Sequence, residues 1–374
     1  MEEAVARRLK ERLEEIVFIE LKKDIAIPGE KAVLRKNIPM PIPVKKLSDR
    51  VSSGDYENLS VKEMVEGMVV LVAADPAFEH NPYYTSLMKG MDENMDRVIT
   101  GSAIELAENN RLEDAFAFFE TATVLNPSNL DAAYNKAKVC EALSRETADR
   151  ELAKAWEKEA FTLMEKLTVD FEDFSMPYYH LGFHYSNSGL YKKAQLSWEH
   201  FIENSDDENK IMEVQEMLIK ISDRIIFDEG YNEVLSGAFE TGLEKLLSIE
   251  EVNPSWWNLL FFIALAYRNL GKMDQAVEYF EKVIRIKPDQ AESLNELGLC
   301  HSALGNLSEA ARYFKKALNM DAENPEILCN NAMAQMEMGN MELAEKYLNR
   351  SSELDPNDPV TLACMNELNK FKNN

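Results

Sequence analysis

Two histidines at helical spacing are the residues in this sequence that come closest to a catalytic arrangement. His180 and His184 are four residues apart, so on an α-helix both imidazole rings lie on one face and could bind the same metal ion. The glutamate of an HExxH motif is absent, and no third ligand stands at a matching spacing. We therefore expect these rings to serve in packing or surface hydrogen bonding. A metal-dependent enzyme using the pair is the alternative.

Other signatures of catalysis are missing from the sequence. It contains no GxGxxG, GxxxxGK(S/T) or GxSxG motif, and His80, His200 and His301 are scattered along the chain. Isolated pairs of Asp and Glu carry little information in a chain this acidic. We expect no catalytic residue, no metal and no cofactor.

The cysteines favour a reducing compartment. Cys140, Cys300, Cys329 and Cys364 lie far apart, without a CxxC pair or the dense framework of small secreted domains. The N-terminal stretch MEEAVARRLKERLEE alternates in charge where a signal peptide needs an apolar run. The longest apolar run, Leu259 to Ala266, is too short to cross a bilayer. These features predict a cytoplasmic protein.

The charge balance narrows the range of partners. The chain has 41 Lys and Arg against 66 Asp and Glu, a net charge of -25, which repels nucleic acid phosphates and anionic lipids. Hydrophobic residues make up 45% of the chain, enough to bury a continuous core. We expect a folded acidic protein that binds neither nucleic acid nor membrane.

A repeat of 34 residues organises the C-terminal part of the chain. This interval separates the members of two series, Gly271, Gly305 and Gly339, and Ala276, Ala310 and Ala344. In each copy, apolar residues recur at helical spacing on two segments, and the glycine between them is suited to ending a helix in a left-handed conformation. A period of this length is typical of repeats built from paired helices.

The clearest copy, SLNELGLCHSALGNLSEAARYFKKALNMD, resembles the tetratricopeptide repeat in pattern and period. Its first helix has Leu294, Leu297 and the small Gly298, where the neighbouring helix can approach closely, and its second helix has Ala310, Phe314 and Ala317. The family's usual tyrosine is His301 here. The resemblance implies an all-α fold, a right-handed α-α superhelix (TPR solenoid), that binds another polypeptide.

Seven such units fit the sequence when two helical insertions are allowed. Pro127 and Pro254 are 127 residues apart, which equals three periods of 34 (102) plus insertions of 11 and 14. The units are 96–129, 130–174, 175–208, 223–256, 257–290, 291–324 and 325–358, with a helical insertion at 209–222. We expect elongated helices near 147–168 and 209–229. A helical lead-in cap at 60–95, a C-terminal capping helix at 359–374 and one continuous core complete the prediction.

The N-terminal residues 1–59 differ in kind. An amphipathic helix with Val5, Leu9, Leu13 and Ile16 on one face leads into a segment with Pro28, Pro39, Pro41 and Pro43. Alternating prolines exclude helix and favour polyproline II or an edge strand, so we expect an extended arm.

This arm is basic, with six Lys and Arg between Lys31 and Arg50 against one acid, Asp49. It is either a solvated linker or a segment that docks on the acidic solenoid, where it would compete with a partner. Docking within the same molecule and docking into a neighbouring copy both stay open, and the second would make an arm-mediated homo-oligomer.

By resemblance to the family, the first helix of each unit lines a concave groove. The positions that then face the groove include several rings, and the predicted peptide-binding residues are Tyr134, Tyr179, Phe183, Phe227, Tyr231, Phe261, Leu265, Asn295, Leu299, Asn330 and Met333. A row of exposed rings is a costly patch unless a ligand covers it. The alternative is that curvature or the insertions bury these rings inside the protein.

Some members of the family grip a terminal carboxylate through Lys, Asn and Arg side chains. This chain has Asn295 and Asn330 but lacks the lysines and the arginine, and Glu292, Glu296 and Glu326 are nearby. The acids favour a peptide or helical ligand with basic residues. We expect a protein–protein interaction scaffold or adaptor and no enzyme.

Overall fold

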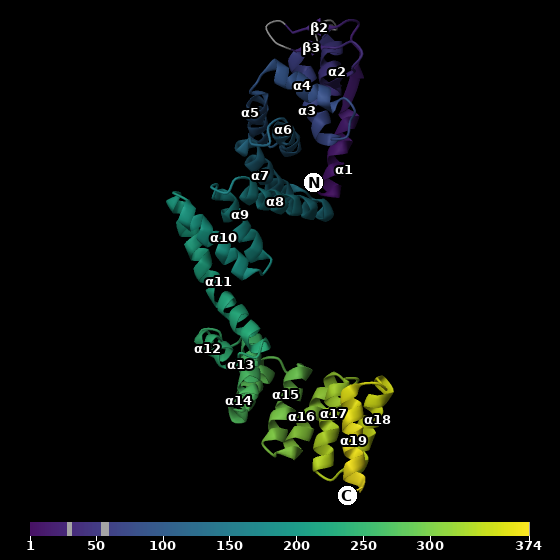
Figure 1. Ribbon diagram of the computed structural model, residues 1–374, viewed down its shortest axis with the longest axis vertical. Helices are drawn as coiled ribbons and strands as arrows, with labels where there is room; N and C mark the ends of the chain where they lie inside the picture. The colour runs from purple at the N-terminus through teal and green to yellow at the C-terminus, as the bar shows by residue number, and fades with distance from the viewer. Residues whose placement is uncertain (28–31, 54–59, 374) are drawn as a thin grey trace. The chain divides into compact units, whose positions relative to one another are not determined.

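The structure is a computed structural model that describes residues 1–27, 32–53 and 60–373, and it is α-helical over most of this length (Figure 1). Contacts between residues divide the chain into two compact units, Met1–Leu218 and Ile219–Asn374. The boundary falls inside α11 (Glu208–Leu235), a helix of 28 residues. Sequence analysis predicts one continuous core, so this division is a finding of the structure.

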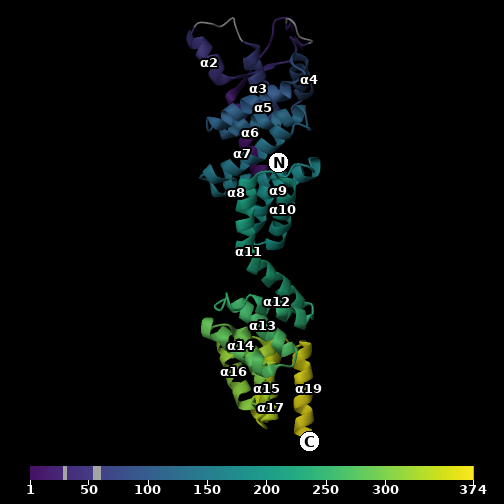
Figure 2. The same cartoon turned by 90° about the vertical axis from the view of Figure 1, so that its left-hand side faces the viewer.

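Consecutive helices form pairs in both units. The first unit contains α5 (Met95–Glu108) and α6 (Leu112–Leu125), α7 (Leu130–Glu146) and α8 (Arg150–Asp170), and α9 (Met176–Asn187) and α10 (Tyr191–Asn204), the last two side by side in Figure 2. The second contains the end of α11 with α12 (Phe239–Ser248), α13 (Trp257–Asn269) and α14 (Met273–Ile286), α15 (Ala291–Ala303) and α16 (Leu307–Met320), α17 (Pro325–Glu337) and α18 (Met341–Leu354), and α19 (Pro359–Asn373). α8 and α11 are long helices near the predicted insertions.

Two kinds of glycine explain why these pairs form. Gly271, Gly305 and Gly339 have φ angles of 74°, 77° and 83°, the left-handed conformation that ends the first helix of a pair. Gly298 serves close packing instead, because a Cβ atom there would lie 2.4 Å from the Phe314 ring. The second helix can therefore place its ring directly against the backbone of the first.

The lead-in helices begin where the sequence places capping signals. In α3 (Val61–Ala74), the Ser60 hydroxyl accepts from the backbone N–H of Glu63, and the Glu63 carboxylate accepts from the backbone N–H of Ser60. α4 (Asn81–Met91) has proline in its first turn. The buried Met68 and Val69 of α3 belong to the same core cluster as Phe116 and Phe119 of α6, so α3 continues the layering of the repeats.

The N-terminal segment is more structured than the predicted extended arm. It contains α1 (Glu3–Glu11), a 3₁₀ turn (Arg12–Glu15) and two small antiparallel sheets, in which β1 (Ile16–Ile19) pairs with β4 (Met40–Pro43) and β2 (Ile25–Ala26) pairs with β3 (Val33–Leu34). A helix, α2 (Val44–Ser53), follows β4 and was not predicted. Pro28 and Lys31 lie outside the described residues, and the side chains of Asp49 and Arg50 are not among those described.

The described part of this segment packs inside its own unit. Val5 and Leu9 of α1 and Met40 and Ile42 of β4 are buried in the first unit's core. The Arg8 guanidinium Nε donates to Glu113 of α6 at 2.8 Å, and the backbone N–H of Glu2 donates to Glu159 of α8 at 2.6 Å. These contacts lie on second helices of pairs, whereas the predicted groove lies on first helices. Competition with a partner stays a prediction.

Gly67 of α3 offers a test of how β4 is seated. Alanine at Gly67 should lower the free energy of unfolding by about 1–3 kcal/mol, because its Cβ would lie 2.1 Å from the backbone carbonyl oxygen of Pro41. The control is Gly101→Ala on α5, where nothing lies within 4 Å of the added Cβ and alanine should stabilise by up to about 1 kcal/mol. Denaturant unfolding followed by circular dichroism measures both. Equal effects of the two substitutions would contradict the close packing of Pro41 against α3.

Candidate functional site

The residues predicted to line one groove lie in both units. Tyr134, Tyr179 and Phe183 belong to the first unit, and the remaining eight, from Phe227 to Met333, belong to the second. The candidate site is therefore two surfaces, one on each unit, formed by the first helices of the pairs. We call each of them a first-helix surface: residues of α7 and α9 in the first unit, and of the end of α11, α13, α15 and α17 in the second.

A carboxylate between two histidines marks the first-helix surface of the first unit. His180 and His184, on successive turns of α9, donate from Nδ1 and Nε2 to the same oxygen, Oε1 of Glu141 on α7, at 3.0 and 3.3 Å. The other ring nitrogen of His180 lies 3.0 Å from the hydroxyl of Tyr134. Because the carboxylate can only accept, the nitrogens that face it carry hydrogens. This hydrogen-bonded network joins α7 to α9.

Burial and hydrogen bonding act in opposite directions on the pKa of Glu141. Burial alone would raise it, but the hydrogen bonds and charges of His180 and His184 outweigh burial and lower the pKa from 4.5 to about 2. Burial raises the pKa of Tyr134 to about 12, so its hydroxyl keeps its proton and can donate to the imidazole. Glu141 is consequently a carboxylate throughout the neutral range.

The geometry of this network is that of hydrogen bonds between side chains. In the described part of the chain, no group of three or more His, Cys, Asp or Glu residues is arranged to hold a metal ion. Sequence analysis singled out both histidines but missed Glu141. A signal for it exists, because Glu141 follows Tyr134 by seven residues, two helical turns along the same face.

Aromatic side chains surround the network. The Tyr134 ring packs edge-on against Phe174, with centroids 5.0 Å apart, and Tyr179 packs against Phe183 at 5.1 Å. Phe183 also contacts Trp198 at 5.0 Å, so part of this ring is used in packing. The Tyr179 hydroxyl donates to Glu213 at 2.7 Å. Tyr134, Tyr179 and Phe183 are all partly exposed, and they combine apolar surface with polar groups.

In the second unit, most of the predicted rings pack on one another. Phe227 lies 4.5 Å from Trp256 and Tyr231 lies 4.6 Å from Phe262, measured between ring centroids. Phe261 is only 5% exposed and contacts Phe280 of α14, so it belongs to the core. Its neighbour Phe262, one position further along α13, is the partly exposed ring. The alternative that some rings are buried internally thus holds for Phe261.

Three apolar residues occupy equivalent places on successive first helices of the second unit. Leu265, Leu299 and Met333 are 34 residues apart and all partly exposed, on α13, α15 and α17. Beside them the Asn330 amide donates to Asn295 at 3.0 Å, and the Asn295 amide donates to Glu326 at 3.3 Å. Asn295 is buried, with 5% exposure, so Asn330 and Glu326 are the accessible members of these three hydrogen-bonded side chains.

A buried ion pair lies beside this series. Arg268 of α13 and Glu296 of α15 approach to 2.7 Å. Burial raises the pKa of Glu296 to about 7, Arg268 opposes this shift, and the nearby Glu326 and Glu292 add to it. Here burial and the two neighbouring carboxylates outweigh one arginine. The carboxylates outnumber the arginine in this part of the surface.

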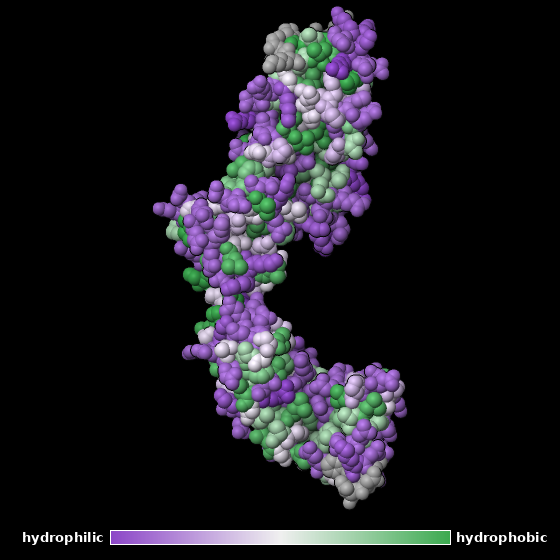
Figure 3. All heavy atoms as spheres, viewed as in Figure 1, coloured by the Kyte–Doolittle hydropathy of each residue, from purple (hydrophilic) through white to green (hydrophobic). Residues whose placement is uncertain are grey.

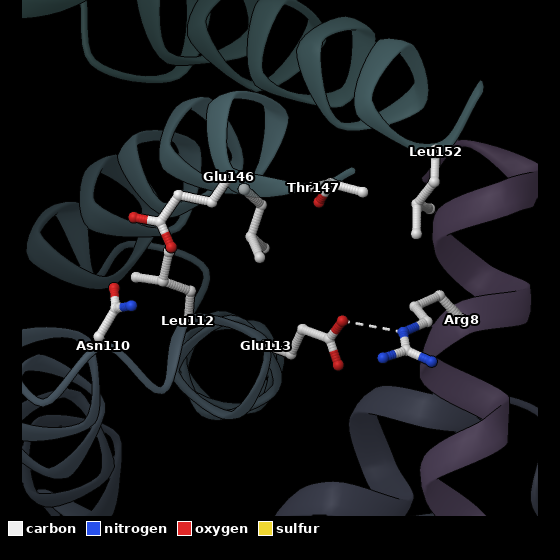
Figure 4. A pocket seen from close by; sticks show the side chains of 8 residues that line it. Arg8, Asn110, Leu112, Glu113, Glu146, Thr147 and Leu152 are labelled. Atoms are coloured by element: carbon white, nitrogen blue, oxygen red, sulfur yellow. Dashed lines mark hydrogen bonds and ion pairs between the residues drawn. The ribbon is translucent and has the colours of Figure 1, made fainter. Parts of the chain in front are cut away.

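A cavity in the first unit lies away from the predicted residues. With a volume of about 310 Å³, it is lined by residues of α1, α6, α7 and α8, including Arg8, Glu113 and Glu146. Figure 4 shows the Arg8 side chain turned toward Glu113 across this cavity. The Arg8 cation is already paired with Glu113 and Glu11, so it is not free to bind an anionic ligand.

The visible face in Figure 3 is largely hydrophilic, with hydrophobic residues in separate small patches. Among the described residues, no helix has the length and apolar character needed to cross a bilayer.

Comparison with known families identifies the repeats. Two models of the tetratricopeptide repeat match residues 257–323 and 303–362. Residues 257–362 therefore contain tetratricopeptide repeats, and the described helices form the paired, all-α solenoid fold that the sequence predicts. Repeats of this family are generally non-catalytic modules for protein interaction, so the fold is that of a protein-interaction scaffold.

Several solved structures are similar to parts of this chain at low sequence identity. A crystal structure of MamA protein is 15% identical over 41% of this chain and 84% of its own, with a TM-score of 0.38. YrrB, described as a TPR protein with an unusual peptide-binding site, is 14% identical over 54% of this chain and 97% of its own, with a TM-score of 0.40. No curated protein sequence matches the chain.

Replacing Glu141 tests the network of the first unit. Glu141→Gln should lower the free energy of unfolding at pH 7 by about 1–3 kcal/mol, because a neutral amide replaces the carboxylate that both histidines face. A lowered pKa means that the stabilisation is present above the ordinary value of 4.5 and is lost as the pH falls toward 2. Between these values the wild-type stability should fall more steeply than that of the variant.

Urea unfolding at a series of pH values measures this difference. Glu105→Gln, which changes an exposed glutamate on α5, is the control and should follow the wild type. Parallel curves for the wild type and Glu141→Gln would show that the carboxylate does not stabilise the fold through the histidines.

Proposed function

We propose that this protein is a non-catalytic, cytoplasmic adaptor whose first-helix surfaces bind an extended peptide or a helix of another protein. The observation that carries the proposal is the series Leu265, Leu299 and Met333, which repeats partly exposed apolar side chains at 34-residue intervals. Such a series is complementary to a chain that presents apolar residues at regular spacing. The Asn330 amide beside it can hydrogen-bond to the backbone of that chain.

The acids beside this series support a ligand with basic residues. Glu292 and Glu326 are exposed, and Glu296 lies beneath them with Arg268 as its partner. A carboxylate cluster of this kind attracts arginine or lysine and repels acidic segments. The proposed ligand therefore alternates apolar residues with at least one cation.

In the first unit, the proposed contacts are Tyr134, Tyr179 and Phe183. Their partly exposed rings lie close to Glu141, and Tyr and Phe in such surroundings contribute large contact areas in protein interfaces. Phe227 and Tyr231 are the corresponding proposed contacts of the second unit, together with Leu265, Leu299 and Met333.

Charge reversal on the second unit tests the proposed ligand chemistry. Peptides selected from a random phage-displayed library against the full chain supply the probes, and fluorescence anisotropy measures their affinities. Glu292→Lys combined with Glu326→Lys should weaken binding of the selected peptides at least tenfold, about 1.4 kcal/mol or more. The effect should shrink as salt is added, because the interaction lies near the surface.

The matched control is Glu281→Lys combined with Glu244→Lys. These exposed glutamates lie on α14 and α12, second helices of their pairs, so the net charge changes equally while the first-helix surface is untouched. If both double variants lower the affinity equally, the change in net charge, and not the first-helix surface, causes the loss of binding. Selection of acidic peptides would oppose the proposed ligand class.

Binding of an arginine peptide should also depend on pH. The cation favours ionised Glu296, so its affinity should increase by roughly three- to tenfold as the pH rises through about 7. Arginine stays protonated in this range, so the change comes from the protein. Glu296→Gln should flatten the profile, whereas the exposed-site control Glu281→Gln should keep it. A profile unaltered by Glu296→Gln would assign the pH dependence to another group.

A further inference from the structure

The last helix pair has polar residues in its interior. Asn331 and Gln335 of α17 and Ser351 of α18 are buried, and the residue one repeat before Asn331 is the buried apolar Leu297. The Asn331 side-chain nitrogen has no hydrogen-bond partner in the described residues. The apolar cluster under α19 is small and contains Cys329, Ala332, Met336, Ala344, Leu348 and Leu368. Polar contacts therefore carry much of the attachment of α19.

Two cysteines meet at this attachment. Cys329 of α17 is 1% exposed, and its sulfur lies 3.4 Å from the hydroxyl of Thr361 on α19. Cys364 follows Thr361 by one helical turn, is partly exposed, and packs against the same cluster. Cys364 therefore lies on the face of α19 that packs against the cluster containing Cys329. Figure 1 shows the helices that carry them side by side with α18.

The surroundings of this pair favour a thiolate. Interaction with the Cys364 thiol lowers the pKa of Cys329, burial opposes this shift, and the hydroxyls of Thr361 and Ser351 add to it. The same interaction, together with burial, raises the pKa of Cys364, so the pair carries its negative charge on Cys329. Burial has the opposite result at the other two cysteines, because it raises the pKa of Cys300 to about 12 and that of Cys140 well above its usual value. Thiolate, not thiol, is the reactive form of cysteine.

We propose that Cys329 and Cys364 are a reversible modification site at which a low-molecular-weight disulfide of the glutathione type oxidises the pair to an internal disulfide. The link fastens α19 to α17, next to Asn330 and Met333 of the first-helix surface. No local pattern indicates this site, because the two cysteines are 35 residues apart and only the packing of α19 brings them together.

The reaction is a pair of thiol–disulfide exchanges. Cys364 first passes its proton to the Cys329 thiolate, so that the negative charge of the pair moves to the more exposed sulfur. The Cys364 thiolate then attacks one sulfur of glutathione disulfide, which forms a mixed disulfide and releases one glutathione thiolate. Cys329 then attacks the Cys364 sulfur and releases the second thiolate. The two protons of the cysteine thiols pass to the two glutathione thiolates. Two protein thiols and one glutathione disulfide thus give one protein disulfide and two glutathione molecules.

Redox titration of the full chain tests the proposal. After equilibration in glutathione buffers of increasing disulfide content, two of its four thiols should disappear while Cys140 and Cys300 stay free. Trypsin should then release residues 317–346 joined to residues 351–370, separable by reduction. Hydrogen exchange of the α19 amides should slow at least tenfold on oxidation and recover after treatment with dithiothreitol.

Cys364→Ser provides the matched comparison, because it keeps a small polar side chain but cannot form the link. Exchange in its α19 should not respond to glutathione disulfide. Four free thiols in the oxidised wild type, or glutathione attached to Cys364 without the joined peptides, would overturn the proposal. So would joined peptides that involve Cys140 or Cys300 in place of Cys329.

Discussion

Two of the helix pairs, α9–α10 and α15–α16, depend on a close contact between a glycine on the first helix and an aromatic ring on the second. Gly298 faces Phe314, and Gly182 faces Trp198, whose ring nitrogen would lie 2.1 Å from an added Cβ. The ring can pack against the backbone of the first helix, and gain dispersion contacts with it, only because glycine has no side chain between them. The ring in turn fixes how the two helices cross and where the chain must turn.

This constraint determines which side chains remain available for function. Residues that face the partner helix are committed to the core, as Phe261 is through its contact with Phe280. Residues one position further along, such as Phe262, or one turn further, such as Leu265, keep part of their surface. The proposed ligand-binding surface thus lies at the same places in successive pairs, where substitutions should cost the fold little.

The sequence predicts the repeats well because their signals are local. The period of 34 and the glycines at 271, 305 and 339 follow from turns and contacts within one pair. Features that depend on non-local packing were missed. Glu141 contacts its histidines only because α7 lies next to α9. The helix α2 follows the strand β4, which is itself held in place by packing against α3. The division inside α11 also has no local marker, because the helix continues through it without interruption. The prediction that Phe261 lies on the surface was wrong, because the repeat pattern does not show which of the two adjacent residues, Phe261 or Phe262, faces the core.

The polar interior of the α17–α18 pair also affects the order in which the protein comes apart. In a linear array each pair is held only by its neighbours, so a weakly packed pair can open while the others stay folded. Asn331, Gln335 and Ser351 can be hydrated with little loss, whereas hydration of the Phe314 or Phe280 layer is costly. Local opening should therefore need less free energy at the α17–α18 pair than at the two pairs before it, and a degradation machine that needs a loose segment would engage the chain there first.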